Sequence, residues 1–474
     1  MNSEVSNNKI SPKALDALMR LGKTYEVGGA VRDKMLRVSE DGKDCDYLVC
    51  GAPLEKITET LRKFGRVDLV GKSFGVIKYT EFSRDGEDTI TRTFDIALPR
   101  TEKSVGVGHK DFDVVFDPEI PVESDLRRRD FTINSMAIAL DDGKLIDPLG
   151  GKEDVANRIL RVNTNESFDE DPLRMLRAAQ FAARFNLMLE PVTMALVKEH
   201  AKLVTTISPE RIAEELNKLL TRARRPSAGF RIMRDTGLLE HILPELQVCV
   251  GVEQPGGFHR WDVFEHTIRV IDSSPPRLRS RLAALFHDIN KPRAKQEVEG
   301  GATFYGHESM GARTTRKVMR RLRYSNELTS EVETLVERHM FTTAVTDRGL
   351  RRLIRRVGLD LIFDLLDLRR ADVLGQGMGG NVDDVDQFEA NIRAEIDRKP
   401  PFGLADLEID GKVLMSTMNL APGPTIGKTL NYLLEKVLDN PADNTPEKLL
   451  DFARSFLNGK IPSSNGDSPQ DLCA

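Results

Sequence analysis

The sequence lacks the long apolar run of about twenty residues that a membrane-spanning helix needs, so no membrane partner is expected. Its opening residues, MNSEVSNNKI, contain no apolar core of a signal peptide. Cysteine is also scarce, with 4 in 474 residues and none in a CxxC pair, which argues against a disulfide scaffold and a zinc ribbon. These absences predict a protein of the reducing cytoplasm.

An excess of basic charge is missing as well, because the formal net charge is -5. By itself this sum argues against a nucleic-acid partner. The arginine clusters have two open interpretations. They are either basic stripes that bind nucleic acid or helix faces that are exposed to solvent. These clusters lie at 127 to 129, 222 to 225, 320 to 323, 351 to 356 and 369 to 370.

The stretch VGGAVRDKMLRVSEDGKDCD carries the first candidate site. Gly28 and Gly29 follow an apolar strand start and precede a helical pattern, so free N–H groups can approach an anion there. Arg32, in the first turn of that helix, can add a charge-assisted fork to the same phosphate. Asp44 and Asp46 follow on a second strand, where alternate residues share one face.

Two carboxylates on one face are oxygen ligands that suit Mg²⁺, which completes its shell with substrate phosphates and water. Such an arrangement indicates phosphoryl or nucleotidyl transfer, in which metal ions align an attacking hydroxyl and neutralise the leaving pyrophosphate. Asp95, in the apolar strand FDIAL, is the candidate for a third carboxylate. Ordinary turn chemistry is the alternative for either half of the motif alone.

Arg128 and Arg129 in DLRRRDFTINSMAIAL can bind a triphosphate or ribose, and Asp130 can hold one of them in place. A weak surface ion pair is the alternative. The glycine-rich, charged stretches at 83 to 88 and 102 to 110 are predicted to be mobile loops that close over substrate.

In DEDPLRMLRAAQFAARF, Asp171 and Arg174 are predicted to share one face of a helix that Pro172 starts. Cytosine and adenine each present an amino donor beside a ring-nitrogen acceptor, so an aspartate beside an arginine can pair with either base. Uracil and guanine would leave polar groups unpaired. A solvated ion pair on a helix face is the alternative.

Beyond residue 250, metal-ligand side chains recur at helical spacing. They are His266, His287 with the adjacent Asp288, His307, His339 and Asp372. Such residues on successive helices can hold one or two metal ions, whereas isolated histidines are usually satisfied core residues.

The fold predicted is α+β and multidomain. We expect an α/β head over 22 to 150, a helical neck over 151 to 250 that recognises the base, a histidine-bearing domain over 251 to 375, a helical tail over 376 to 460 and a disordered end over 461 to 474.

With these pieces placed, the chain resembles the bacterial class II tRNA nucleotidyltransferase and poly(A) polymerase family, most closely its CCA-adding members that carry an HD domain. The resemblance covers roughly residues 22 to 455. It implies an N-terminal α/β nucleotidyltransferase head followed by an all-helical neck, HD domain and tail. It also implies that Gly28, Gly29 and Arg32 contact the nucleotide and that Asp44 and Asp46 ligate Mg²⁺.

Further roles follow from the same resemblance. The residues implied in nucleotide contact are Arg129 and Asp130 for the phosphate or ribose, Asp171 and Arg174 with Glu170 for the base, and the following Arg177. The expected ligands of a second divalent metal in the HD domain are His266, His287, Asp288 and Asp372. The departures are Gln180 and Asn290, where the family usually has arginine and glycine, an additional Arg127, and a slightly longer linker from Arg32 to Asp44.

These features predict an enzyme that adds the 3′-terminal CCA to tRNA from CTP and ATP without a nucleic-acid template. A poly(A) polymerase and CC-only or A-only addition stay open, because the same carboxylates and template residues serve all of them. A chain that acts mainly as a metal-dependent HD phosphohydrolase is the other alternative. The helical C-terminal body is expected to hold tRNA by shape and backbone charge, and the oligomeric state is left undetermined.

Overall fold

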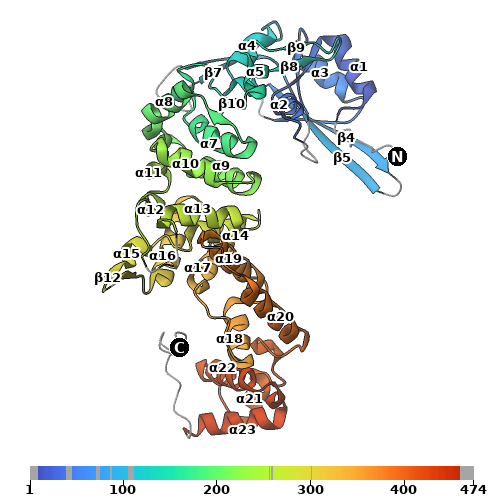
Figure 1. The fold of residues 1–474 in the computed structure, drawn as a ribbon. Helices are drawn as coiled ribbons and strands as arrows, with labels where there is room; N and C mark the ends of the chain where they lie inside the picture. The colour runs from blue at the N-terminus through green and yellow to red at the C-terminus, as the bar shows by residue number, and fades with distance from the viewer. Residues whose placement is uncertain are drawn as a thin grey trace. The chain divides into compact units, whose positions relative to one another are not determined.

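The computed structural model describes residues 9–38, 45–70, 75–85, 88–104, 112–255, 257, 260–299 and 301–459. The chain divides into two compact units, residues 1–244 and 245–474, which run from blue to green and from yellow-green to red in Figure 1. The predicted nucleotide-binding residues that the structure describes lie in the first unit, and the predicted histidines lie in the second.

The first unit is built on a seven-stranded sheet in the order β3-β4-β5-β2-β1-β8-β9. Strands β2 and β5 run parallel, and the other neighbours run antiparallel. The strands are β1 (Lys23–Val27), β2 (Asp46–Cys50), β3 (Arg66–Val70), β4 (Val76–Asp85), β5 (Asp88–Ala97), β8 (Ala137–Ala139) and β9 (Leu145–Ile146). A separate antiparallel pair joins β6 (Arg100–Ser104) to β7 (Phe112–Phe116).

Side-chain alternation along β2 sets up the site. Tyr47 and Val49 are buried in a core with Phe94 of β5, whereas Leu48 packs in a second core on the opposite face. Because alternate residues point to the same face of a strand, Asp46 lies on the Leu48 face, where it is exposed. The cores on both faces therefore fix the direction of this carboxylate.

Helices cover both faces of the sheet. Helices α1 (Pro12–Leu21) and α3 (Leu54–Leu61) pack in the core that contains Tyr47, while α4 (Val122–Arg127) packs in the core that contains Leu48. Helix α2 (Gly29–Leu36) follows β1 directly. A 3-10 turn, η1 (Thr132–Asn134), precedes β8. Ser11 lies at the N-cap of α1, but its hydroxyl donates to Glu81 at 2.6 Å and makes no capping hydrogen bond.

The rest of the first unit is mainly helical. Its elements are α5 (Gly151–Ala156), α6 (Ser167–Glu170), α7 (Leu173–Phe185), α8 (Pro191–His200), η2 (Ala201–Thr206), α9 (Pro209–Arg222), α10 (Ser227–Asp235) and α11 (Leu238–Ile242). Helix α7 packs against α9 and α10. Two short strands, β10 (Ile159–Leu160) and β11 (Met188–Leu189), pair in parallel, so the stretch predicted to be all-helical contains a small β-ladder.

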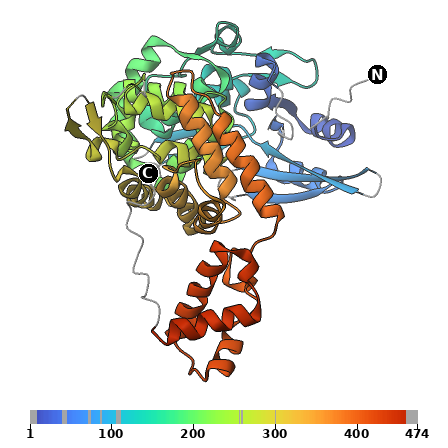
Figure 2. The same ribbon diagram turned by 60° about the horizontal axis from the view of Figure 1, so that its bottom comes forward.

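The second unit is also helical, apart from one short hairpin. After α12 (Pro244–Gln247), which spans the boundary between the units, its elements are α13 (Val263–Ser273), α14 (Leu278–Phe286), α15 (Lys291–Ala294), β12 (Gln296–Val298), β13 (Gly301–Thr303), α16 (His307–Arg321), α17 (Asn326–Arg338), α18 (Asp347–Val357), α19 (Ile362–Gly375), α20 (Asp383–Asp397), η3 (Leu404–Asp406), α21 (Gly411–Met418), α22 (Pro424–Asp439), η4 (Pro441–Asp443) and α23 (Pro446–Leu457). Helices α21 to α23 share a core of their own and form the red group in Figure 2.

The predicted α+β fold class is confirmed, and the main differences fall in the stretches predicted to be mobile loops. Strand β4 continues to Asp85 and β5 begins at Asp88, so the described residues of the stretch 83 to 88 belong to two paired antiparallel strands. Residues 102 to 104 belong to β6, and 105 to 111 lie outside the described residues, as does the predicted disordered end. In β4 and β5 each strand supplies the hydrogen-bond partners of the other strand's backbone groups. A glycine-rich, charged composition does not reveal this pairing, so it predicted a loop. Within the described residues, we find no helix with the length and apolar character to cross a bilayer.

Candidate active site

The turn between β1 and α2 lets an arginine approach the backbone closely. Gly28 is the N-cap residue of α2 and has φ of 69°, a left-handed value that favours glycine. A Cβ at this position would lie 2.7 Å from Arg129 Nη1 and 4.0 Å from Asp46 Oδ2. The absence of a side chain at Gly28 therefore allows Asp46, Arg129 and the N-terminus of α2 to lie close together.

Asp46 has a carboxylate neighbour on the next strand. Tyr47 of β2 is paired in parallel with Ile96 of β5, so Asp46 and Asp95 occupy adjacent positions on the same face of the sheet. Both residues are exposed. Asp95, predicted as a third carboxylate, therefore stands beside Asp46, and Asp44 lies outside the described residues.

Arg32 is more deeply engaged than its sequence position indicates. It is buried, with 3% of its surface exposed. Its Nε and Nη2 donate to Asp33 Oδ1 at 2.8 and 2.6 Å, and its Nη1 donates to Asn134 Oδ1 at 2.7 Å. The guanidinium also lies 4.3 Å from the centre of the Phe185 ring. Most of its donor capacity is thus used within the protein, and the pKa of Arg32 is lowered, chiefly by burial.

The two arginines after α4 are held by Asp125. Arg128 donates to Asp125 Oδ1 from Nε at 3.0 Å and from Nη2 at 2.6 Å, and Arg129 Nη2 donates to Oδ2 at 3.2 Å. Burial opposes ionisation of Asp125, but Arg129 and Arg128 outweigh it and hold the pKa of this carboxyl below its ordinary value. The prediction that Asp130 holds one of these two arginines is wrong, because the end of α4 brings Asp125 close to the residues three and four positions later.

Asp130 turns instead toward α7. Its Oδ2 accepts from Arg177 Nε at 2.9 Å, and its Oδ1 accepts from Asn134 Nδ2 at 2.9 Å. Burial again opposes ionisation, but Arg177 and Asn134 keep the pKa of Asp130 below its ordinary value. This ion pair between a buried carboxylate and a half-buried arginine fastens the arginine-rich loop to α7, the helix that carries Arg174.

Asp171 does not lie in the same helix as Arg174, contrary to the predicted geometry. It follows α6 with an extended backbone, at φ of -140° and ψ of 96°, and α7 begins at Leu173. Pro172 has helical backbone angles and is the N-cap residue of α7, one position before the helix begins. Asp171 Oδ1 accepts from the Leu173 N–H at 3.1 Å and Oδ2 accepts from Arg211 Nη2 at 2.9 Å. The local turn, rather than one helix face, places the pair.

Arg174 links three parts of the site. Its Nη1 donates to Ser167 Oγ at 2.7 Å and to Glu170 Oε2 at 2.8 Å. Its Nη2 donates to the Arg128 carbonyl at 2.9 Å. The start of α7, α6 and the arginine-rich loop are therefore held together by one nearly buried guanidinium, with 9% of the residue exposed.

These residues surround one cavity of about 550 Å³ in the first unit. Asp95, the predicted third carboxylate, is not part of its lining. The lining includes these residues of the predicted nucleotide site: Gly28, Gly29, Arg32, Asp46, Arg129, Asp130, Glu170, Asp171, Arg174 and Arg177. Ten lining residues are arginine or lysine and five are acidic. This excess of positive charge suits a polyphosphate, and the exposed carboxylate of Asp46 is an oxygen ligand that suits a divalent cation.

One wall of the cavity, formed by α9, was not predicted from the sequence. The wall formed by this helix consists of Arg211, Glu215, Lys218 and Arg222. The spacing of four, three and four residues places them on one helix face, which was the available signal. Arg100, Asn134 and Arg184 also line the cavity. At Gln180, the departure from the family pattern, the residue is 1% exposed and its Nε2 has no hydrogen-bond partner among the described residues.

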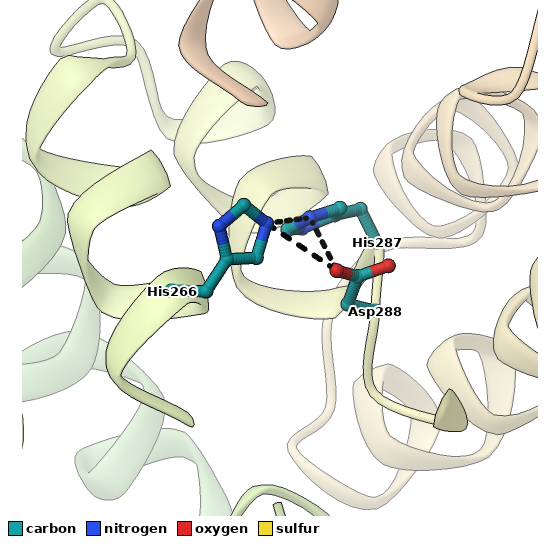
Figure 3. A group of neighbouring side chains, drawn as sticks. All are labelled: His266, His287 and Asp288. Atoms are coloured by element: carbon teal, nitrogen blue, oxygen red, sulfur yellow. Dashed lines mark hydrogen bonds and ion pairs between the residues drawn. The ribbon is translucent and has the colours of Figure 1, made fainter. Parts of the chain in front are cut away.

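A second cluster in the other unit gathers all six predicted metal-ligand residues. Figure 3 shows His266, His287 and Asp288 pointing toward one another. Asp288 Oδ2 lies 3.4 Å from His266 Nε2 and 3.1 Å from His287 Nε2, and Asp372 Oδ1 lies 3.1 Å from His266 Nε2. On the other side, Asp288 Oδ1 lies 3.3 Å from His307 Nε2 and 3.8 Å from His339 Nε2.

Backbone carbonyls orient three of these imidazoles. The Nδ1 atoms of His287, His307 and His339 each lie 2.8 Å from the carbonyl oxygen three residues earlier. A neutral imidazole that donates through Nδ1–H presents the lone pair of Nε2, which faces the cluster here. Burial lowers the pKa of His339 to about 3, so this imidazole is neutral near pH 7. The cluster could hold divalent metal in two groups that share Asp288.

The turn after Asp288 needs no glycine. Asn290, where the family usually has glycine, has φ of -106°, which any L-residue can adopt. Its Nδ2 donates to Thr314 Oγ1 at 2.8 Å. Lys291 Nζ lies 2.8 Å from both Asp288 Oδ2 and Gln254 Oε1. The departure at this position therefore leaves the arrangement of the ligand-type residues intact.

Three family models match the chain. The model described as the poly A polymerase head domain matches residues 24–161, and the probable RNA- and SrmB-binding site of polymerase A matches residues 186–249. A putative tRNA nucleotidyltransferase domain 2 matches residues 302–453. The first match contains the β1–α2 turn, Asp46 and the arginine-rich loop, and it precedes the predicted base-reading residues.

Characterised relatives and solved structures agree with these matches. The multifunctional CCA protein of Nitrosococcus oceani is 38% identical over 311 residues, which are 63% of this chain and 70% of that protein. The A-adding tRNA nucleotidyltransferase of Deinococcus radiodurans is 36% identical over 334 residues, 66% of this chain and 75% of that protein.

The fold is similar to that of the Bacillus stearothermophilus CCA-adding enzyme in complex with CTP, at a TM-score of 0.69 and 21% identity over 95% of this chain and 99% of that chain. The Thermotoga maritima CCA-adding enzyme complexed with tRNA aligns at a TM-score of 0.53 and 22% identity over 96% of this chain and 100% of that chain. The chain therefore belongs to the tRNA nucleotidyltransferase and poly(A) polymerase family.

Proposed function

We propose that this protein is an enzyme that adds the 3′-terminal CCA to tRNA from CTP and ATP without a nucleic-acid template. The observation that carries the proposal is one cavity that joins the exposed Asp46 of β2 to a cationic wall and to Asp171 and Arg174. Relatives named as CCA proteins support it. Because the proposed substrate is tRNA, the proposed location is the cytoplasm. The proposal also keeps the domains predicted from the sequence, which are a head over 22 to 150, a neck over 151 to 250, a histidine-bearing domain over 251 to 375 and a tail over 376 to 460.

The carboxylates are proposed to hold Mg²⁺. Asp46 and Asp95 offer hard oxygen ligands on one sheet face beside the cationic cavity, which fits the donor set that Mg²⁺ prefers. Asp44 and Asp46 are the proposed main ligands, with Asp95 as the third carboxylate. When bound, the metal would activate the attacking hydroxyl and neutralise charge on the leaving pyrophosphate.

In the proposed reaction, the 3′-terminal hydroxyl oxygen of tRNA bonds to the α-phosphorus of CTP or ATP, the bond to pyrophosphate breaks, and the hydroxyl proton passes to solvent. The protein positions the reactants. Arg129 is held by Asp125 and fits against Gly28, which has no Cβ to displace it. It lines the cavity with Asp46, where it can bind phosphate. Positioning of this kind lowers the entropic part of the barrier.

Base selection is proposed to rest on Asp171 and Arg174. The Asp171 carboxylate is oriented by the Leu173 N–H and by Arg211, and the guanidinium of Arg174 is oriented by Ser167, Glu170 and the Arg128 carbonyl. An amino group and a ring nitrogen, present in both cytosine and adenine, complement this acceptor and donor. The opposite pattern in uracil and guanine leaves polar groups unpaired, which is costly in a closed site.

The test is to incubate the purified protein with Mg²⁺ and a tRNA transcript that lacks its last three nucleotides, supply CTP, ATP or both, and sequence the 3′ ends. We expect CCA followed by a stop. CC alone, A alone or a long A tail would move the function to a sibling activity with the same chemistry. An Asp46→Ala variant that still extends tRNA would contradict the role of this carboxylate.

A second activity is supported by the histidine cluster. We propose that the residues His266, His287, Asp288 and Asp372, with His307 and His339, hold divalent metal and hydrolyse phosphate esters as an HD-type phosphohydrolase. Asp288 contributes Oδ2 to the group with His266 and His287 and Oδ1 to the group with His307 and His339. Because each group has its own carboxylate oxygen, the arrangement favours two ions over one. The donor set of imidazoles and carboxylates suits transition metals as well as Mg²⁺.

Metal analysis separates this activity from nucleotidyl transfer. After loading and dialysis, metal bound per chain is measured for the wild type and for His287→Ala, with His241→Ala as the control outside the cluster. We expect His287→Ala to lose bound metal and phosphate-ester hydrolysis while it still adds CCA. A His287→Ala protein that retains both metal and hydrolysis would contradict the assignment.

A further inference from the structure

Most arginine clusters of the second unit hold its helices together. Arg351 of α18 donates to Glu395 of α20 at 2.8 Å and to the Leu438 carbonyl at 2.7 Å. Arg352 and Arg355 pair with Glu435 of α22. The cluster at 369 to 370 is engaged in the same way, by carboxylates of α19 and α20. The paired arginines of these two clusters are therefore internal ties, and the interpretation as nucleic-acid stripes stays a prediction for them.

Helix α16 differs from these elements. One side of it is packed, with Ala312, Thr315 and Met319 buried. Its opposite side carries Arg313, Lys317 and Arg320, which are exposed. Across the part of the chain that the structure describes, none of these three side chains takes part in an ion pair or side-chain hydrogen bond. The acidic residues near the helix are already engaged, Glu333 with Arg316 and Glu245 with Arg321.

The three cations form one continuous face. Their spacing of four and then three residues places them on one side of an α-helix. At about 1.5 Å per residue they extend over about 10 Å of helix surface. The protein has a net charge of -5, so this row is a local patch of positive charge on an acidic body, and such a patch attracts a polyanion.

We propose that the face of α16 formed by Arg313, Lys317 and Arg320 binds consecutive phosphates of the tRNA backbone. This inference rests on the proposed function, which supplies a polyanionic substrate. The face is the exposed surface of a helix, and α16 lines neither the nucleotide cavity nor the cavity beside Arg351 and Glu395. It therefore suits an extended phosphate backbone better than a single nucleotide enclosed in a pocket. Contacts of this kind hold an RNA in place without reading its sequence.

The test compares the triple variant Arg313→Ala/Lys317→Ala/Arg320→Ala with a matched variant, Lys56→Ala/Arg62→Ala/Lys63→Ala. The control removes the same charge from exposed positions on and just after α3, away from the cavity lining. Affinity for a tRNA that lacks CCA is measured by fluorescence anisotropy at several salt concentrations. Steady-state CCA addition is measured in parallel at varied tRNA.

For the α16 variant, we expect the slope of log K against log salt to become shallower by about 2 to 3, since each lost phosphate contact removes about 0.7 to 0.9. The KM for tRNA should rise about ten-fold or more, while kcat at saturating tRNA and the KM for CTP stay unchanged. The α3 control should match the wild type in every measurement.

A salt slope and a tRNA KM equal to those of the wild type would overturn the inference. Equal losses in the α3 control would also overturn it, because the effect would then follow net charge rather than this face. A wild-type protein that binds tRNA with the expected salt slopes but adds no nucleotides would contradict the proposed function alone.

Discussion

The replacement of Asp125 by asparagine tests how the arginine-rich loop is held. Asparagine keeps the shape of the side chain but removes the charge between Arg128 and Arg129. Asp125 is fully buried, whereas the two arginine side chains are 22% and 21% exposed. Loss of one partner of a fully buried ion pair costs about 3 to 5 kcal/mol. Because the arginines reach solvent, we expect the free energy of unfolding to fall by about 1 to 3 kcal/mol.

Catalysis should fall more than stability alone would require. A hydrogen bond from a charged group contributes about 1.5 to 3 kcal/mol, so misplacement of one phosphate-binding arginine should lower kcat/KM for CTP about ten- to hundred-fold. The matched control is Glu395→Gln, which discharges a buried carboxylate paired with Arg351 in the second unit. That variant should lose stability and keep kcat/KM for CTP. Urea unfolding and single-nucleotide incorporation measure the two effects.

The pH dependence of this pair has a definite sign. The pKa of Asp125 is depressed in the folded protein, by Arg129 and Arg128 against the effect of burial. Its contribution to stability is therefore complete above the unfolded pKa of about 3.9 and is lost as the pH falls through the folded pKa. The stability difference between wild type and Asp125→Asn should be constant near neutral pH and shrink only in strong acid. An Asp125→Asn protein that is destabilised yet keeps full kcat/KM for CTP would refute the positioning role.

Four further outcomes are expected. Asp46→Asn should lower CCA addition at least about a thousand-fold in extension assays, because a metal ligand is lost, with an unchanged unfolding curve. Gly28→Ala should lower kcat/KM about ten-fold or more, since its Cβ meets Arg129, whereas Gly143→Ala, with a φ of 72° and nothing within 4 Å, should cost only about 1 to 2 kcal/mol of stability. Asp171→Asn should raise UTP incorporation relative to CTP about ten-fold, because an amide can donate to the uracil carbonyl; an unchanged ratio would argue against base reading here. EDTA should lower the Tm of the wild type more than that of Asp288→Asn, because bound metal stabilises only the folded state; equal shifts would argue against a structural metal in the histidine cluster.

Local patterns in the sequence determined much of the first unit. The helix that begins at Pro209, the glycine turn before α2 and the strand that begins at Asp46 all follow from spacing and from residues with narrow backbone preferences. The gathering of the six metal-ligand residues was also predictable as a group, because they recur on successive helices. For the helix, the turn and the strand, the signal lies within a few residues of the feature that it predicts.

The partners of charged groups were decided only by the tertiary structure. Asp130 turns to Arg177, 47 positions later in the chain, and leaves Arg128 and Arg129 to Asp125. Helix α9 supplies a wall of the cavity, and the paired arginines of two clusters serve as internal ties. Spacing along a chain shows which residues share a helix face, but which face meets which neighbour depends on how the elements pack. A buried charged side chain pairs with an opposite charge that is close in space, because burial of an unpaired charge costs much free energy.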